Sequence, residues 1–124
     1  MSIQQQVQAV RARMAAAAES SGRRPEDIAL CAATKVQSDD TIRAAIAAGI
    51  TLCGENRVQE LTAHLAAGAY EGARVHFIGH LQTNKVKQVV GQVDLIQSVD
   101  SLHRFRRWTA RRTSWGWSRT SCWR

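Results

Sequence analysis

Four short apolar runs, each followed by a polar turn and then a helical pattern, constrain the fold of this chain most strongly. The runs begin near residues 28, 50, 74 and 93. Strands that alternate with helices favour a parallel sheet, because parallel neighbours need a crossover that is usually a helix. Two α/β architectures fit: a small doubly wound sheet, or the N-terminal half of a (β/α)8 TIM-type barrel with about four parallel strands. The pattern alone favours the doubly wound sheet, which needs no further residues.

The segments between the runs have helical spacing and recognisable ends. Ser2 and Gln5 resemble a capping box at the start of the first helix, and Ser38 can cap the second. Glycines follow the expected ends of the helices, where a left-handed residue commonly stops a helix. The expected helices lie at about 2–21, 38–49, 57–67 and 83–90, and a further one opens near residue 98.

Polar residues follow every apolar run and therefore meet at one edge of the expected sheet. They lie at 34–35, 54–57, 79–85 and 98–101. Ligands of parallel sheets bind at the carboxyl ends of the strands. Lys35 closes the first run, and a neutral lysine amine there can form a Schiff base with an aldehyde. A lysine at a strand end also commonly marks nothing more than the edge of burial.

Several of these residues have a second interpretation that is purely structural. Asn56, Thr83 and Ser101 are equally suited to cap the helices that they precede. Gly79 suits a tight turn. His80 has no second ligand at metal-binding spacing, so the sequence predicts no metal site.

The net charge of +7 is concentrated at one end of the chain. Seven of the 17 basic residues and all four tryptophans lie in 104–124, which contains no acidic residue. The ten basic residues that remain in 1–103 balance the ten acidic ones, so the body shows no nucleic-acid footprint. The chain has no apolar stretch long enough to cross a membrane and no secretion signal, and its three cysteines lack metal spacing. These features predict a cytoplasmic protein with reduced thiols.

Two longer segments carry a family resemblance. Residues 54–60 (Gly-Glu-Asn-Arg-Val-Gln-Glu) and 76–85 (His-Phe-Ile-Gly-His-Leu-Gln-Thr-Asn-Lys) closely resemble the signature stretches of the pyridoxal-phosphate homeostasis proteins. The strand end at Lys35 and the segment 98–101 resemble that family too. These proteins share the barrel of the alanine racemase N-terminal domain, and the resemblance extends over about 1–103.

The resemblance implies half of a (β/α)8 barrel that binds pyridoxal 5′-phosphate (PLP) as a Schiff base on Lys35. It implies a carrier in vitamin B6 and amino-acid homeostasis, with PLP and small amines or amino acids as partners and no robust catalysis. The resemblance implies a monomer, as in the family, whereas half a barrel is also open to self-association. No specific nucleic acid and no membrane are expected as partners. The remaining cofactor-binding residues that the resemblance implies are Asn56, Gly79, His80, Gln82, Asn84 and Ser98.

The segment 104–124 departs from the family and has neither helical nor strand periodicity. Read one nucleotide back, each tryptophan codon TGG becomes a leucine, valine or methionine codon, and arginine codons CGN become alanine, serine, threonine or proline codons. We therefore expect a disordered tail that arose by a frameshift, on a truncated and impaired barrel. Two alternatives stay open: a fragment of a racemase-like PLP enzyme, and an Arg/Trp arm that binds polyanions.

Overall fold

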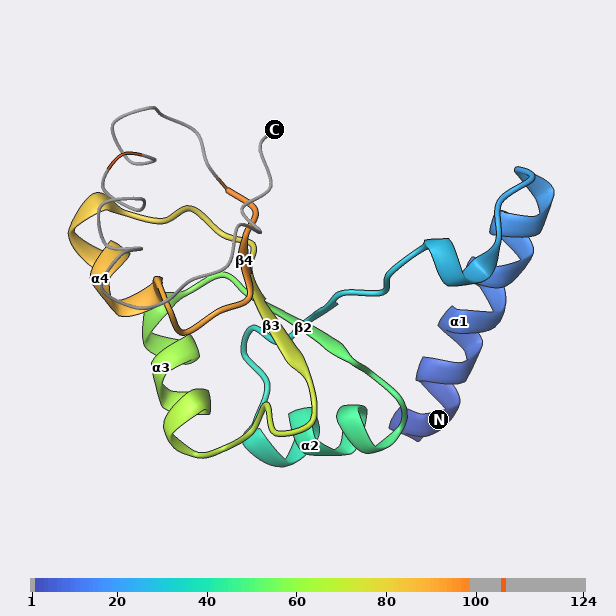
Figure 1. Cartoon of the computed structure of the whole chain (residues 1–124). Helices are drawn as coiled ribbons and strands as arrows, with labels where there is room; N and C mark the ends of the chain where they lie inside the picture. Colours follow the sequence, from blue (N-terminus) through green and yellow to red (C-terminus); the bar gives the residue numbers. More distant parts are fainter. Residues whose placement is uncertain (1, 99–105, 107–124) are drawn as a thin grey trace.

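The structure, a computed structural model, describes residues 2–98 and residue 106, which include a four-stranded parallel sheet and its helices (Figure 1). The strands are β1 (Ala32–Ala33), β2 (Leu52–Glu55), β3 (Arg74–Phe77) and β4 (Leu95–Ile96). The α-helices are α1 (Ile3–Ser20), α2 (Asp39–Ala47), α3 (Val58–Ala66) and α4 (Val86–Val89). Two short 3-10 turns, η1 (Pro25–Asp27) and η2 (Thr83–Lys85), complete the described elements.

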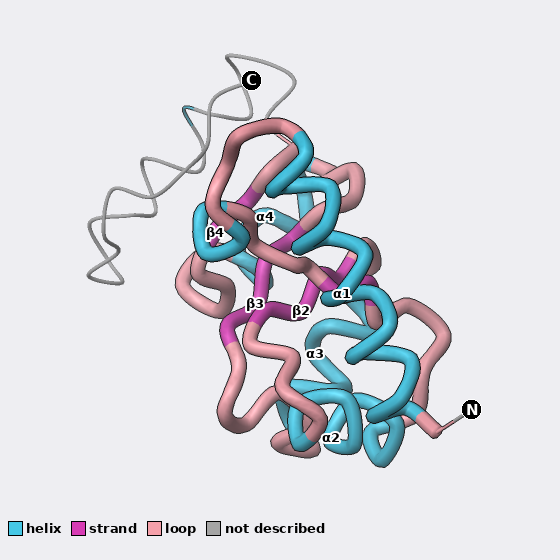
Figure 2. The backbone as a smooth tube through the Cα atoms, turned by 90° about the vertical axis from the view of Figure 1, so that its right-hand side faces the viewer, coloured by secondary structure: helices cyan, strands magenta, loops and turns pink. Residues whose placement is uncertain are grey.

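The order of the strands distinguishes the two architectures that the sequence allows. The sheet has the order β1-β2-β3-β4, and every neighbouring pair is parallel. A doubly wound sheet reverses its strand order at a switch point, whereas a barrel keeps the order of the chain. The preference for a doubly wound sheet is therefore wrong, and half of a (β/α)8 barrel is the fold. Figures 1 and 2 show α2, α3 and α4 along the sheet, with α1 beyond α2.

The helices cover one face of the sheet only. The register aligns Glu55, Phe77 and Ile96 across three strands, and all three side chains are fully buried. The alternate row is the register set Ala33, Gly54, His76 and Leu95. Because successive strand residues point to opposite faces, this second row faces away from the core. It corresponds to the lumen side of a barrel.

The predicted ends of the helices are mostly confirmed. Ser2 and Gln5 form the capping box of α1, and the Ser38 hydroxyl accepts a hydrogen bond from the Thr41 amide at the start of α2. The capping roles considered for Asn56 and Thr83 are wrong. The cap position of α3 is Arg57, and that of η2 is Gln82, in both cases without a side-chain cap. Asn56 is therefore not committed to capping.

Three of the four strands are shorter than the apolar runs that predicted them, and β2 keeps the expected length but lies two residues further along, so that Gly54 and Glu55 are inside it. The run 28–35 contributes only the two residues of β1 to the sheet. The expected helix at 83–90 divides into η2 and the single turn of α4. The shortening follows from pairing, because a residue joins the sheet only where its neighbour strand provides a hydrogen-bond partner.

Cys31 and Cys53 are free thiols. Burial raises the pKa of Cys53 to about 11, with smaller contributions from Cys31 and Glu55, and burial also raises the pKa of Cys31.

Among the residues that the structure describes, no helix is both long and apolar enough to cross a membrane. Three expectations fall on 99–124, which lie outside the described residues apart from Arg106: the Arg/Trp tail, the Ser101 cap and the body of the helix expected to open near residue 98.

His76, on the open face of β3, should make folding stability depend on pH. Burial lowers its pKa below the ordinary value of 6.5; nearby Asp94 opposes this shift and Arg74 adds to it. Gln97 Nε2 lies 2.9 Å from His76 Nδ1, an arrangement that suits a neutral ring. The folded state then binds fewer protons than the unfolded state, so stability should fall as the pH drops through the unfolded value.

Urea unfolding on both sides of roughly pH 6.5, the free histidine value, tests this dependence. The loss of stability toward acid should be smaller in His76→Gln, which keeps a polar side chain but does not titrate. An identical pH dependence in the parent chain and the variant would show that His76 does not contribute.

Candidate functional site

A fully buried carboxylate organises the carboxyl end of β2. Glu55 is the last residue of β2, and its side chain has no exposed surface. The hydroxyls of Thr34 and Tyr70 each lie 3.2 Å from Glu55 Oε2. The backbone amides of Asn56 and Arg57 donate to Oε1 at 2.9 and 3.4 Å. Four donors from three segments of the chain therefore satisfy one buried acid, as burial of a carboxylate requires.

Two carboxylates, Glu55 and Glu60, fix the backbone on the two sides of Lys35. Thr34 is tied to Glu55 through its hydroxyl and to β2 through its amide, which donates to the Gly54 carbonyl at 3.0 Å. Val36 donates its amide to Glu60 Oε2 at 3.1 Å. Lys35 lies between these two anchors, in the turn after β1, and its side chain is exposed. Within the described part of the chain, its amine has no hydrogen bond or ion pair.

The Lys35 turn has an unusual backbone. Val36 has φ of 61°, in the left-handed region that a β-branched residue rarely occupies, and its residue surface is 81% exposed. Such a conformation costs about 1–3 kcal/mol and persists only where the surroundings hold it. Two hydrogen bonds hold it here: the Val36 amide donates to Glu60, and the Gln37 amide donates to the Thr34 carbonyl at 3.2 Å across the turn. The turn is therefore held by a tertiary contact together with its own local hydrogen bond.

Two further residues of α3, Glu60 and His64, make hydrogen bonds that connect α3 to the Lys35 turn and to α2. His64 is buried, and its Nδ1 lies 2.6 Å from Asp39 Oδ1 at the start of α2. Glu55, Glu60 and His64 bring ligand-type atoms within 4.8 Å of one another. Each of the three already has a partner: the Glu55 donors, the Val36 amide and Asp39. We therefore interpret this cluster as structural. Glu55 and Glu60 hold the turn at Lys35, and His64 links α3 to α2.

The next two strand ends meet at Asn56. A methyl group built on Gly79 would lie 2.7 Å from both Cα and Cβ of Asn56, so the absence of a side chain permits this close approach. The Ser98 hydroxyl donates to the Gly79 carbonyl. Asn56 Oδ1 is buried and has no hydrogen-bond partner among the described residues. The structure thus brings together three predicted site residues and leaves one amide oxygen unsatisfied.

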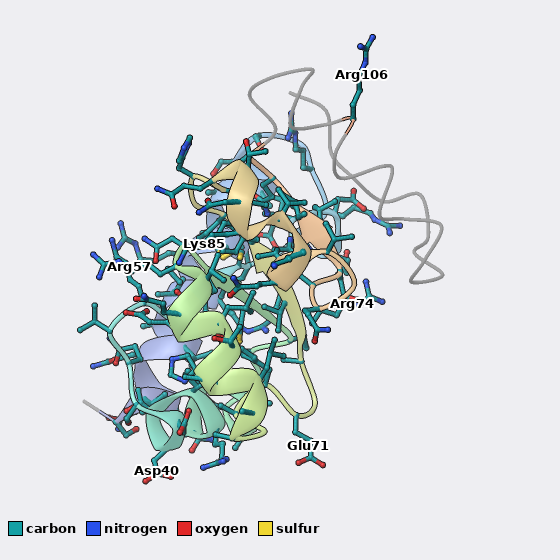
Figure 3. All side chains as sticks on the ribbon, turned by 90° about the vertical axis from the view of Figure 1, so that its left-hand side faces the viewer. Asp40, Arg57, Glu71, Arg74, Lys85 and Arg106 are labelled. Carbon is teal, nitrogen blue, oxygen red and sulfur yellow. The ribbon has the colours of Figure 1, made fainter. Side chains whose placement is uncertain are left out.

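A surface pocket of about 230 Å³ opens beside Asn56. Its lining includes two cationic side chains, Arg57 at the start of α3 and Lys85 in η2, and no acidic one. Figure 3 shows these two close to each other at mid-height in the view, with the acidic Asp40 and Glu71 lower down. His80 and Gln82 line the pocket as well. Asn84 is exposed in η2 and is not part of the lining.

The sequence did not identify the buried supports of this site. Glu55 was visible as a strand-end residue, but its role depends on Tyr70, which comes from the connection between α3 and β3. Burial raises the pKa of Tyr70 well above its usual range, and the nearby Glu55 also raises it. Tyr70 is therefore a neutral donor at physiological pH. The signal that could have found Glu55 is its place at the end of an otherwise apolar run.

These features define the class of protein: half of a parallel (β/α) barrel with an exposed lysine and polar groups at the strand ends. Comparison with models of protein families gives no match. Two curated relatives are pyridoxal phosphate homeostasis proteins. That of Aquifex aeolicus is 41% identical over 71% of this chain and 39% of its own length. That of Escherichia coli K12 is 40% identical over 75% of this chain and 41% of its own length.

Solved structures agree with these relatives. PipY of Synechococcus elongatus with PLP bound has a TM-score of 0.82 and 31% identity, over 98% of this chain and 53% of the other. A protein from Bifidobacterium adolescentis, described as unknown, has a TM-score of 0.83 and 38% identity, over 92% of this chain and 51% of the other. The resemblance to the pyridoxal phosphate homeostasis proteins is confirmed, and the chain spans about two-fifths of the length of the curated relatives that it matches.

The approach of Gly79 to Asn56 can be tested by adding a methyl group. Gly79→Ala should lower the free energy of unfolding by about 1–3 kcal/mol, because the obstruction at 2.7 Å includes backbone that cannot rotate away. Gly54→Ala is the matched control, since its new methyl group would meet the side chains of Cys31 and Ile78. Those side chains can shift, so the loss should be smaller in urea unfolding. Equal losses would mean that the Asn56 backbone gives way as easily as a side chain.

Proposed function

We propose that this chain binds PLP and holds it as a Schiff base on Lys35, as a carrier and not as a catalyst. The observation that carries the proposal is the Lys35 turn. Its amine is exposed at a strand end, while Thr34 and Val36 are fastened to Glu55 and Glu60. The cofactor would supply an aldehyde, with which a lysine amine condenses with loss of water. A fixed backbone around a free amine lowers the conformational cost of presenting it.

Asn56 provides a second reason to place the cofactor here. Its Oδ1 is buried without a partner, and a buried polar atom of this kind is costly unless a ligand or water satisfies it. Ala33 and Gly54 are register partners, so Lys35 and Asn56 each lie two residues beyond a paired position. Both residues therefore follow the carboxyl ends of adjacent strands. The Asn56 amide would orient the polar edge of the cofactor ring.

The pocket beside Asn56 favours an anionic occupant. Arg57 and Lys85 line it without an acidic neighbour, and a phosphate group is stabilised by such a pair of cations. His80 and Gln82 share this lining and would contact the same group. Gly79 and Ser98 would act on the cofactor indirectly, by setting the position of Asn56. A contact from Asn84 remains a proposal.

A carrier role fits the side chains better than a racemase-like one. Racemisation needs a second base on the far side of the cofactor. Glu55 and Tyr70 are buried, and the Tyr70 hydroxyl donates to Glu55, so neither is presented to a ligand as that base. The relatives named above are homeostasis proteins, which supports a role in maintaining the PLP pool. Exchange of the cofactor with small amines or amino acids is part of this proposal.

Covalent trapping tests the role of Lys35. The chain has three lysines, Lys35, Lys85 and Lys87. After incubation with PLP and reduction with borohydride, peptide mass spectrometry should find the pyridoxyl group on Lys35. Lys35→Arg keeps the charge but cannot form the bond, so it should lose both the adduct and the visible absorbance. Lys87→Arg, at an exposed position of α4, should keep both. An adduct of equal yield in Lys35→Arg would refute the assignment.

Replacement of Asn56 separates binding from folding. Asn56→Ala removes an oxygen that has no partner among the described residues, so the unliganded chain should keep its urea stability within about 0.5 kcal/mol. The affinity for PLP, measured by titration of the absorbance, should fall about tenfold, as expected for one lost hydrogen bond. Gln88→Ala, on the exposed side of α4, should leave the affinity unchanged. Unaltered binding in Asn56→Ala would place the cofactor elsewhere.

A further inference from the structure

We propose that two copies of this chain pair β1 of one with β4 of the other, in both directions, and so close an eight-stranded barrel. The proposal concerns an interaction surface and does not depend on cofactor binding. Within the described residues, β1 and β4 each have one neighbour in the sheet. The other edge of each strand presents backbone groups that can pair with a further strand.

The direction of the hydrogen bonds shows which groups are open. Thr34 donates its amide to Gly54 in β2, so the amide and carbonyl of the preceding residue, Ala33, point to the outer edge. Gln97 donates its amide to Phe77 in β3, so the amide and carbonyl of Ile96 point outward in the same way. Among the described residues, Ala33 and Ile96 therefore mark two edges without a partner strand. All strands of the sheet are parallel, so a two-fold rotation about the barrel axis brings β4 of a second copy alongside β1 with the parallel direction kept.

An apolar groove lies next to the β1 edge. Its volume is about 320 Å³, and its walls come from α1, β1 and α2. No charged residue is among the lining, which includes Val7, Leu30, Ala32 and Ala45. The complementary edge of a second copy is also apolar, since β4 consists of Leu95 and Ile96. The two edges match in polarity as well as in direction, and a free apolar groove of this kind favours association.

The size of the sheet argues for a second copy as the occupant. The chain covers 51% of the Bifidobacterium adolescentis structure and 53% of PipY, with TM-scores of 0.83 and 0.82. One copy therefore has the curvature of half a barrel, and two such halves complete one turn of strands. Closure would also cover the open face that contains Ala33, His76 and Leu95. Strand ends from both copies would then surround the end of the barrel at which Lys35 lies.

The test is the mass of the full chain in solution. Sedimentation equilibrium over a wide range of concentration should show a species of twice the chain mass that dissociates on dilution. Ala33→Pro removes the outward amide and leaves the Thr34 hydrogen bond to β2 in place, as proline allows at a strand edge. It should raise the dimer dissociation constant by about tenfold or more, with an unchanged circular dichroism spectrum.

A second pair of variants protects the test against misfolding of Ala33→Pro. Gln6 and Gln8 are both exposed residues of α1, but only Gln6 lines the groove. Gln6→Lys should weaken the dimer about tenfold because it brings a charge to an apolar contact, and Gln8→Lys should not. A monomer at all concentrations, an open polymer, or a dimer that neither Ala33→Pro nor Gln6→Lys weakens would overturn the proposal. A monomer would include the case in which residues 99–124 occupy the groove.

Discussion

The buried carboxylate of Glu55 is the interaction on which the rest of the site depends. A carboxylate without exposed surface would be prohibitively costly unless several donors surrounded it. Here the donors come from the end of β1, from the start of the loop after β2, and from the connection that precedes β3. Satisfying one charge therefore fixes three segments relative to one another. The position of the strand ends is a consequence of that requirement.

The proposed functional side chains lie beside these fixed points. Lys35 follows Thr34, and the Asn56 side chain extends from a residue whose backbone amide is itself a donor to Glu55. The buried residues provide rigidity, while their neighbours keep free polar atoms for a ligand. The strained Val36 fits this division, since its amide donates to Glu60 while its side chain stays exposed. Strain held by the surroundings is common beside binding sites.

The sequence predicted the elements of the fold well and their arrangement less well. Helical spacing and caps located α1 and α2, because Ser2 and Ser38 act through local hydrogen bonds. Local patterns could not determine the strand order, since both architectures share the same alternation of elements. The family resemblance, not the periodicity, gave the half barrel. The lengths of β1, β3 and β4 were overestimated and β2 was placed two residues too early, because pairing depends on the neighbouring strand.

The candidate site shows the same division between local and tertiary information. The strand-end rule brought Asn56, Gly79 and Ser98 together correctly, because parallel strands end at one edge. The link from Glu55 to Tyr70 spans fifteen positions of sequence and leaves no periodic trace. The distinction between Asn84, which is exposed in η2, and Gln82, which lines the pocket, also needed the turn geometry.

A crystal structure of the full chain after incubation with PLP tests the central claim most directly. The account predicts electron density continuous with Lys35 Nζ and a polar atom of the cofactor within hydrogen-bond distance of the Asn56 amide. Thr34 and Val36 should keep their contacts with Glu55 and Glu60. Density attached to Lys85 or Lys87, or a cofactor that leaves the Asn56 amide without a partner, would contradict it.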